Sequence, residues 1–279
     1  RILFAGSFTS PANGLLAVSQ DAAFSSDWRV IVGGAVNVVH QSPDGSILVG
    51  GSFTAVNGET RNRLARIVPS STLERGLALS ASDNVFALSH QATGSIVVGG
   101  SFSTLGGKNT PVLARLTPSN TVDSAPVQGL VGAVNSVLSN ADGSLLFGGT
   151  FSMSAGSQFS NLARLNPSGV HDTAFVPNPN GTVYSMSRQQ DGSVVVGGAF
   201  TQIGGVPGAY LARVSSAGVI DTAFDPSVSA TVRTLALQED GMLLVGGAFA
   251  TIDGLPQGRL ARLTTSGSPD MSFIGEANN

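Results

Sequence analysis

The feature that most constrains the fold is a repeat of 49 residues that runs through the chain. Its most recognisable part is an apolar run closed by a glycine doublet, as in Asp191-Gly-Ser-Val-Val-Val-Gly-Gly-Ala-Phe200. A weaker copy, Arg1-Ile-Leu-Phe-Ala-Gly-Ser-Phe8, opens the chain. A fixed period of roughly 40 to 50 residues with short strands is typical of propeller blades. The first glycines of the doublets are Gly50, Gly99, Gly148, Gly197 and Gly246.

Each copy of the repeat predicts four antiparallel strands. In the copy around Asp191, the first strand is expected at 183–189 and the second at 193–201, with an Asp-Gly turn between them. The third is expected at 210–215, after a Gly-rich loop, and the fourth ends at Phe224. Asp-Gly between apolar runs suits a tight turn, and an apolar second strand suits burial on both faces. The predicted fold is all-β, a six-bladed β-propeller of four-stranded antiparallel blades.

The repeat continues without a linker, so we expect a single β-propeller domain over residues 1–279. When the copies are aligned, one first strand and the turn after it are missing from the set of six. The N-terminal blade is therefore expected to lack its innermost strand, as in a chain cut from a longer one. The blades are expected at approximately 1–33, 34–82, 83–131, 132–180, 181–229 and 230–279.

Two hydrophobic features of the repeat predict how the blades pack. A glycine inside a strand indicates a bulge or a close approach of backbone, and the doublets are expected to have such a role. The phenylalanine that follows each doublet after one residue is expected to fill the gap between neighbouring blades. These residues are Phe53, Phe102, Phe151, Phe200 and Phe249.

An arginine in a Leu-Ala-Arg triplet recurs on the third strand, and an acid follows it eight residues later. A charge that returns in nearly every blade indicates a structural role, because a binding site needs only one copy. We expect each pair to form a partly buried, charge-assisted contact. The pairs are Arg66 with Glu74, Arg115 with Asp123, Arg164 with Asp172, Arg213 with Asp221, and Arg262 with Asp270.

Composition excludes several classes of function. Charged residues make up only 11% of the chain, the net charge is -3, and Lys108 is the single lysine. Without a basic stripe, nucleic acid is not an expected partner. No apolar run reaches the roughly 18 residues of a membrane-spanning helix, so membrane insertion is not expected. The chain has no cysteine, which excludes disulfides and thiolate chemistry.

The stretch Asp44-Gly-Ser-Ile-Leu-Val-Gly-Gly-Ser-Phe-Thr54, followed by Leu-Ala-Arg and by Asp-Thr-Ala-Phe in later copies, resembles the bacterial delta-sixty repeat family. The likeness covers residues 1–273. It implies a kelch-like β-propeller that is secreted or displayed at the bacterial surface, often within a large multidomain protein, and that has no established enzymatic activity. Kelch-type blades tend to carry a Tyr and a Trp each, whereas this chain has only Tyr184, Tyr210 and Trp28.

Residue types that carry catalysis or bind metals are sparse. The three histidines, His40, His90 and His171, are expected on different blades, which disfavours a catalytic triad or a metal centre. The Asp-Gly turns offer too few oxygens for calcium. The carboxylates outside turns and arginine pairs are interpreted as polar surface, not as a glycosidase pair. They are Asp27, Glu59, Asp83, Asp225, Asp253 and Glu276. No catalytic residue, metal or cofactor is therefore expected.

One position varies among the copies while its neighbours stay apolar or small. It is the second residue of the first strand, and it is expected to lie near the propeller axis, at the end where the loops before the first strand and after the second emerge. Trp28 and Phe159 are expected at the same end. Aromatic, arginine and asparagine side chains together could hold a sugar or a peptide. The variable residues are Asn37, Phe86, Asn135, Tyr184 and Arg233.

Two functions remain open at this point. The favoured one is a non-catalytic extracellular module, monomeric within a longer protein, that binds a glycan or a protein at this mouth or spaces neighbouring domains. The alternative is a carbohydrate-active lyase or hydrolase that works in the same mouth. The uniformly short loops favour the first, since function in propellers usually lies on long, unequal loops. Two carboxylates, or a histidine and an acid, within about 10 Å of each other in a pocket at this mouth would favour the second.

Overall fold

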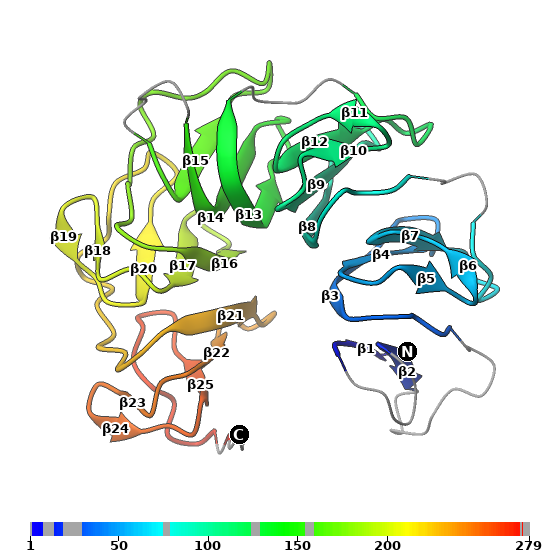
Figure 1. Ribbon diagram of the computed structural model, residues 1–279. Helices are drawn as coiled ribbons and strands as arrows, with labels where there is room; N and C mark the ends of the chain where they lie inside the picture. The colour runs from blue at the N-terminus through cyan, green and yellow to red at the C-terminus, as the bar shows by residue number, and fades with distance from the viewer. Residues whose placement is uncertain are drawn as a thin grey trace. The chain divides into compact units, whose positions relative to one another are not determined.

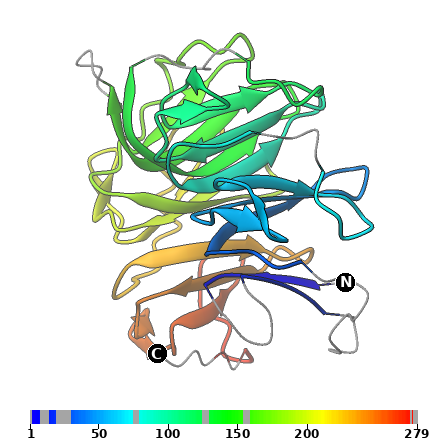
Figure 2. The ribbon, with the colours of Figure 1, turned by 45° about the vertical axis from the view of Figure 1, so that its right-hand side comes forward.

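The structure is a computed structural model, and it describes residues 2–7, 14–18, 30–74, 79–123, 129–153, 159–273 and 275. All regular elements in these ranges are β-strands, which confirms the prediction of an all-β protein (Figures 1 and 2). In the same ranges, no helix has the length and apolar character that crossing a membrane requires. The chain divides into two compact units, residues 1–143 and residues 144–279.

The first unit contains two three-stranded antiparallel sheets, which we name by their first strands. The β3 sheet has the order β3 (Val36–Gln41), β4 (Ile47–Gly51), β7 (Leu64–Ile67). The β8 sheet has the order β8 (Val85–His90), β9 (Ile96–Gly100), β12 (Leu113–Leu116). Strands β1 (Ile2–Ala5) and β2 (Leu15–Val18) pair with each other, and β13 (Leu130–Ser139) is the last strand of the unit.

The second unit repeats this plan. Strand β14 (Leu145–Met153) pairs with β15 (Leu162–Leu165). The β16 sheet has the order β16 (Val183–Arg188), β17 (Val194–Gly198), β20 (Leu211–Val214). The β21 sheet has the order β21 (Val232–Leu237), β22 (Leu243–Gly247), β25 (Leu260–Leu263).

A fourth strand was predicted for each blade, but in the four three-stranded sheets described above it is reduced to a single bridge. In the β16 sheet this bridge joins Val214 and Ile220. The chain turns away at once, because the Asp221 carboxylate accepts the amide of Ala223 at 3.0 Å and the Asp221 carbonyl accepts the amide of Phe224. An aspartate that bonds its own backbone two residues on forms a turn that competes with a strand. The sheets are therefore three-stranded.

The predicted Gly-rich loop between the second and third strands is a short β-ribbon instead. In the β16 sheet, Gly204 and Gly205 have φ of 60° and 78°. Positive φ at both central residues is the geometry of a type I′ hairpin turn. The ribbons are β5 (Ala55–Val56) with β6 (Glu59–Thr60), β10 (Thr104–Leu105) with β11 (Lys108–Asn109), β18 (Gln202–Ile203) with β19 (Val206–Pro207), and β23 (Thr251–Ile252) with β24 (Leu255–Pro256).

The glycine doublet allows two close approaches, as the sequence predicted. A Cβ on Gly197 would meet Val232 Cγ1 of the next sheet at 2.5 Å. A Cβ on Gly198 would collide with the carbonyl oxygen of Thr182, just before strand β16. Equivalent crowding recurs at the doublets of the β3 and β8 sheets. The first glycine therefore lets neighbouring sheets approach, and the second leaves room for the carbonyl of the residue just before the first strand.

The phenylalanines after the doublets are core residues. Phe53, Phe102, Phe200 and Phe249 have no exposed surface, and Phe151 is 3% exposed. The cluster around Phe102 joins the β8 sheet to Leu48 and Leu64 of the β3 sheet. The cluster around Phe249 joins the β21 sheet to Val195 and Leu211 of the β16 sheet. Within each unit, the core therefore lies between adjacent sheets.

Candidate functional site

The variable residues of the first strands occupy β-bulges. In the β16 sheet, Val183 pairs with Gly198 and Ser185 with Gly197, so Tyr184 is an extra residue with no partner in the ladder. Asn37, Phe86 and Arg233 have the same place opposite the doublets of their own sheets. A bulge leaves one residue outside the pairing and re-aims its side chain. The side chain at this position can therefore change without altering the ladder.

Neighbouring bulges contact each other within each unit. In the second unit, the guanidinium carbon of Arg233 lies 5.4 Å from the centre of the Tyr184 ring, a cation–π geometry. In the first unit, Asn37 Nδ2 donates to the carbonyl of Val85, next to Phe86, at 3.2 Å. Tyr184 and Phe86 are half-buried, and Asn37 and Arg233 are exposed. Tyr184 and Arg233, two of the predicted ligand-binding residues, thus form one surface.

The other predicted mouth residues have different surroundings. Asn135 is half-buried on β13, which lies next to β8. Phe159 is only 4% exposed, and its ring stacks on that of His171 with 3.6 Å between centroids. Its interpretation as an accessible ligand-binding side chain is therefore corrected to that of a core residue. Trp28 lies outside the described residues.

Arg233 differs from the arginines of the Leu-Ala-Arg triplets in the same unit. Among the residues that the structure describes, it contacts no carboxylate. Arg164, Arg213 and Arg262 each bind an aspartate at 2.6 Å. A guanidinium whose hydrogen-bond donors are not already paired can bind an anionic or carbonyl oxygen of a ligand.

The recurring arginine–acid pairs are present in the structure. Arg115–Asp123 has the same 2.6 Å separation as the three pairs of the second unit. In the β3 sheet, Arg66 Nε lies 3.2 Å from Glu74, while Arg66 Nη2 lies 2.6 Å from Asp44. The β3 sheet therefore shares its arginine between two acids. The hydrogen bond from Arg213 to Asp221 lowers the pKa of that carboxyl below its usual value, as the bond from Arg164 does for Asp172.

Arg213 makes two further contacts that the sequence did not indicate. Its guanidinium lies over the Phe224 ring at 4.7 Å, and its Nη1 donates to the carbonyl of Thr265 in the next sheet at 2.8 Å. Arg164 repeats this arrangement with Phe175 and the carbonyl of Ser216. Each of these two arginines therefore joins the end of its own blade to the following blade.

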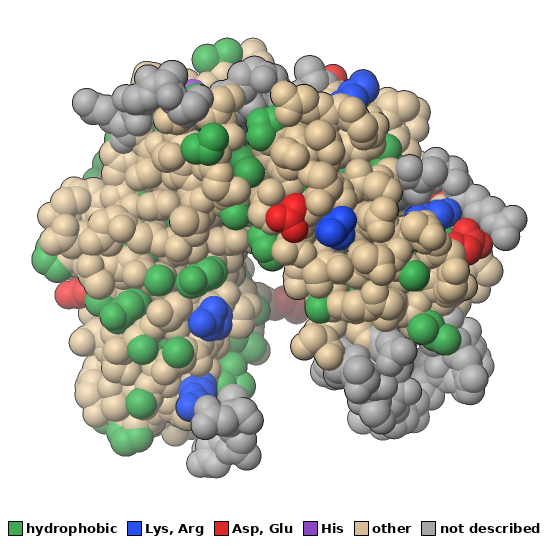
Figure 3. Space-filling view, viewed as in Figure 1, with side chains coloured by type: hydrophobic (Ala, Val, Ile, Leu, Met, Phe, Trp, Pro, Cys, Tyr) green, Lys and Arg blue, Asp and Glu red, His purple; other side chains and the backbone are tan. Residues whose placement is uncertain are grey.

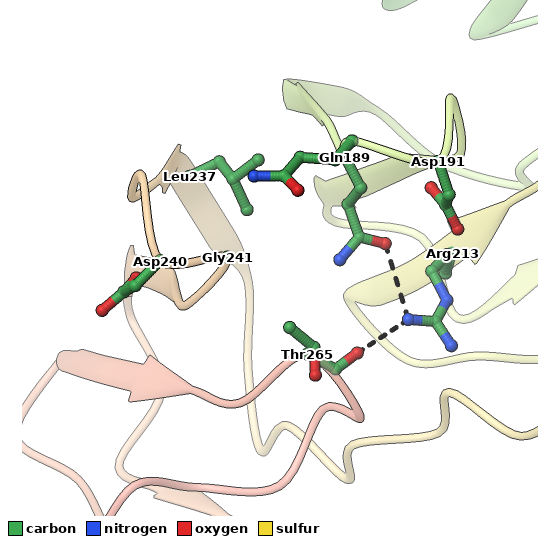
Figure 4. A pocket seen from close by; sticks show the side chains of 8 residues that line it. Gln189, Asp191, Arg213, Leu237, Asp240, Gly241 and Thr265 are labelled. Atoms are coloured by element: carbon green, nitrogen blue, oxygen red, sulfur yellow. Dashed lines mark hydrogen bonds between the residues drawn. The ribbon is translucent and has the colours of Figure 1, made fainter.

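A pocket of about 230 Å³ opens between the β16 and β21 sheets beside Arg213 (Figure 4). Asp191 and Asp240 line it from the Asp-Gly turns of the two sheets, and Leu237 lines it from β21. The Asp191 carboxylate accepts the hydroxyl and the amide of Ser193, at 2.6 and 2.9 Å, and these bonds lower its pKa. Asp191 is thus held by its own turn, in accord with its predicted structural role.

The histidines do not form a metal centre with acids in the described ranges. His40 and His90 stack with 6.1 Å between ring centroids and an interplanar angle of 9°. Burial and the neighbouring His90 lower the pKa of His40 below its usual value. Within the same ranges there is no group of three or more His, Cys, Asp or Glu that could hold a metal ion.

The carboxylates interpreted as polar surface do not recur at the same position of the repeat. Asp83 and Asp253 bond backbone amides of the connections at 2.8 Å, and Glu59 lies 3.4 Å from Arg61. Asp225 is exposed, while Asp27 and Glu276 lie outside the described residues. On the face drawn in Figure 3, charged side chains are few and lie singly or in small groups among neutral ones.

Three solved structures with a similar fold are distant from this chain in sequence. The WD40 β-propeller domain of Doa1 has a TM-score of 0.56 at 11% identity, covering 90% of this chain and 67% of that one. Catalytically inactive virginiamycin B lyase from Staphylococcus aureus, with quinupristin, has 0.58 at 14%, covering 92% and 75%. YCF48 bound to D1 peptide has 0.54 at 16%, covering 91% and 72%. No curated protein matches the sequence.

One family profile matches the repeats of this chain. It is described as "Domain of unknown function (DUF5122) beta-propeller". The matched segments together make up more than half of the chain. They are residues 42–76, 91–125, 141–175, 189–224 and 238–273.

Proposed function

Since the chain belongs to the family described as "Domain of unknown function (DUF5122) beta-propeller", we propose that it is a non-catalytic binding module. It forms one six-bladed propeller over residues 1–279, with the blade boundaries expected from the repeat. It recognises a glycan or a protein. The variable first-strand residues Asn37, Phe86, Asn135, Tyr184 and Arg233 are its recognition positions.

The observation that carries this proposal is the bulge itself. Val183, Gly197 and Gly198 form the ladder around the bulge, and the same residue types recur in the other copies. Tyr184 at the bulge is replaced by a different residue type in all the other copies. Packing forces the ladder residues, because no larger side chain fits the doublet. It does not force the bulge residue, which lies outside the ladder. Diversity at a position that the ladder leaves free is therefore best explained by ligand recognition.

The chemistry of the Tyr184–Arg233 surface suits a ligand with both a flat apolar face and oxygen acceptors. The tyrosine ring offers an aromatic face, and Arg233 offers hydrogen-bond donors without a competing carboxylate among the described residues. The propeller fold in YCF48 is compatible with binding a peptide. Sugars meet the same chemical requirements.

We place this module outside the cell, as part of a larger surface or secreted bacterial protein. The resemblance of the repeats to the delta-sixty family supports this location. The low charge and the absence of cysteine from the sequence are compatible with it.

The proposal is tested by screening glycan and peptide arrays and then measuring affinity for any hit. Tyr184→Ala and Arg233→Ala are each expected to weaken binding about tenfold or more, because each removes part of one contact surface. Thr234→Ala, next to the bulge on the same strand, is the matched control and should leave affinity unchanged. A hit whose affinity ignores both bulge substitutions would contradict the proposal. Turnover of a bound glycan would instead support the carbohydrate-active enzyme.

A further inference from the structure

A second surface lies on the outer edge of the β16 sheet, away from the bulges. A groove of about 200 Å³ separates the β18–β19 ribbon from the segment 220–225. We call it the rim groove. Its walls are mostly apolar, and two carboxylates, Asp221 and Asp225, stand along one side. Its apolar lining comes from Val206, Pro207, Leu211, Ala212, Ile220 and Phe224.

In the β8 sheet, the chain places its single lysine at the same locus. Lys108 and Val122 precede Val206 and Ile220 by two repeats of 49 residues. The Lys108 ammonium donates to the carbonyl oxygen of Val122 at 2.6 Å, from the ribbon to the outermost segment. A lysine side chain therefore fits between these two elements and finds an acceptor there.

The corresponding acceptor in the β16 sheet is Ile220. The bonds around its bridge to Val214 come from neighbouring residues: Ser215 N donates to Val219 O, and Asp221 N donates to Arg213 O. In this pattern the N–H and C=O of the bridged residue point away from the partner strand. Val122 has the same arrangement, through Thr117 and Asp123. Where Val122 receives Lys108, Ile220 receives no side-chain donor from the described residues, because Val206 stands in the place of the lysine.

The two carboxylates of the rim groove differ in their contacts with the described residues. Asp221 is bound by Arg213 at 2.6 Å. Asp225 is exposed and makes no hydrogen bond or ion pair with the residues that the structure describes. An apolar groove whose lining includes a backbone carbonyl and an unpaired carboxylate is complementary to an alkyl chain with a terminal cation.

We propose that the rim groove binds a lysine side chain of a partner protein. The methylene stem lies along Val206 and Leu211, and the ammonium reaches the Ile220 carbonyl and Asp225. A second copy of this chain is not the source, because its one lysine is already bound to Val122. This site is independent of the bulge residues, so it stands or fails separately from the function proposed above.

The test uses a pair of short peptides that differ in one group. One is acetyl-Gly-Lys-Gly-amide, and the other carries an acetylated lysine ε-amine. Amide NMR spectra of the whole chain are recorded at millimolar peptide, the range expected for one buried side chain. The lysine peptide is expected to shift amides of the rim groove, and the acetylated peptide is expected to leave them unchanged. Asp225→Asn should weaken binding about fivefold, which corresponds to about 1 kcal/mol.

Val206→Lys gives a second, reciprocal test. It transfers the Lys108 arrangement to the β16 sheet, so it is expected to abolish binding of the lysine peptide and to raise the melting temperature. Val206→Met, similar in length but uncharged, should not raise the melting temperature. Equal shifts with both peptides, or undiminished binding by Val206→Lys, would overturn the proposal. Binding of putrescine without binding of the lysine peptide would overturn it as well.

Discussion

At the scale of single residues, the recurring arginine has more contacts than a salt bridge. Arg213 binds Asp221, covers Phe224 and donates to the carbonyl of Thr265 in the next sheet. Its side chain is 19% exposed. A largely buried guanidinium with several partners stabilises more than an exposed pair, and removing it leaves those partners unsatisfied.

Replacing this arginine should therefore lower stability. Arg213→Met is expected to reduce the free energy of unfolding by about 2 kcal/mol at neutral pH, a loss of about 5 °C in Tm. Thermal melts followed by circular dichroism measure it. Arg233→Met, an exposed arginine without a carboxylate among the described residues, is the control and should melt like the wild type. An unchanged melt for Arg213→Met would contradict a structural role for the pair.

The same substitution should also change the pH dependence. The Arg213 hydrogen bond lowers the pKa of Asp221 in the folded state. The stabilisation is then complete above the unfolded pKa of about 3.9 and is lost as the pH falls through the lower folded value. Wild type should therefore lose stability more steeply than Arg213→Met as the pH is lowered below about 4.

At the scale of elements, the glycine doublet and the bulge opposite it act together to set how the first and second strands pack. The bulge brings the backbone before the first strand across the end of the second, and the absence of a Cβ on Gly198 leaves room for the Thr182 carbonyl. The doublet should thus tolerate no side chain, although it lies in a regular strand.

Gly198→Ala tests this directly. The added methyl group collides with backbone, which cannot rotate away, so a loss of about 2 to 3 kcal/mol is expected. Gly208→Ala is the matched control, because its Cβ would meet Ile203 Cγ2 at an ordinary 3.4 Å. Chemical denaturation of both variants measures the difference. Equal stabilities for the two would show that the doublet is not required by packing.

The sequence predicted the elements that depend on periodic burial. Strands β16, β17 and β20 lie within the expected ranges, and Phe200 is fully buried as foreseen. It did not predict the β18–β19 ribbon, because a two-residue strand has too few side chains to show alternation. The fourth strand was expected to end at Asp221-Thr-Ala-Phe224, but the Asp221 carboxylate bonds the Ala223 amide and the chain turns away from the sheet.

The candidate site was predicted in part. Variation among the copies located Tyr184 and Arg233 correctly on their strands, but the sequence does not reveal that they occupy bulges. Phe159 was misplaced because an aromatic residue in a loop can pack inward as easily as outward. Lys108 was noted only for its charge. Comparing its place in the repeat with Val206 would have shown that it is exceptional.

At the scale of the whole molecule, the question is whether the repeat folds as one domain. The chain divides into two compact units at residue 143, yet the 49-residue period continues through that point. A single domain should unfold in one calorimetric transition whose enthalpy equals the van't Hoff value. Scanning calorimetry of the full chain is expected to give that result. Two separable transitions would instead mean that residues 1–143 and 144–279 unfold independently.

The residues at the bulges have a further consequence for how such proteins diversify. Because Asn37, Phe86, Tyr184 and Arg233 are supernumerary to the strand pairing, mutation can exchange them while the scaffold keeps its register. Related chains could then acquire new specificities by point substitution, without loop insertions. For the same reason, a combinatorial library randomised at these codons would be a practical source of engineered affinity reagents.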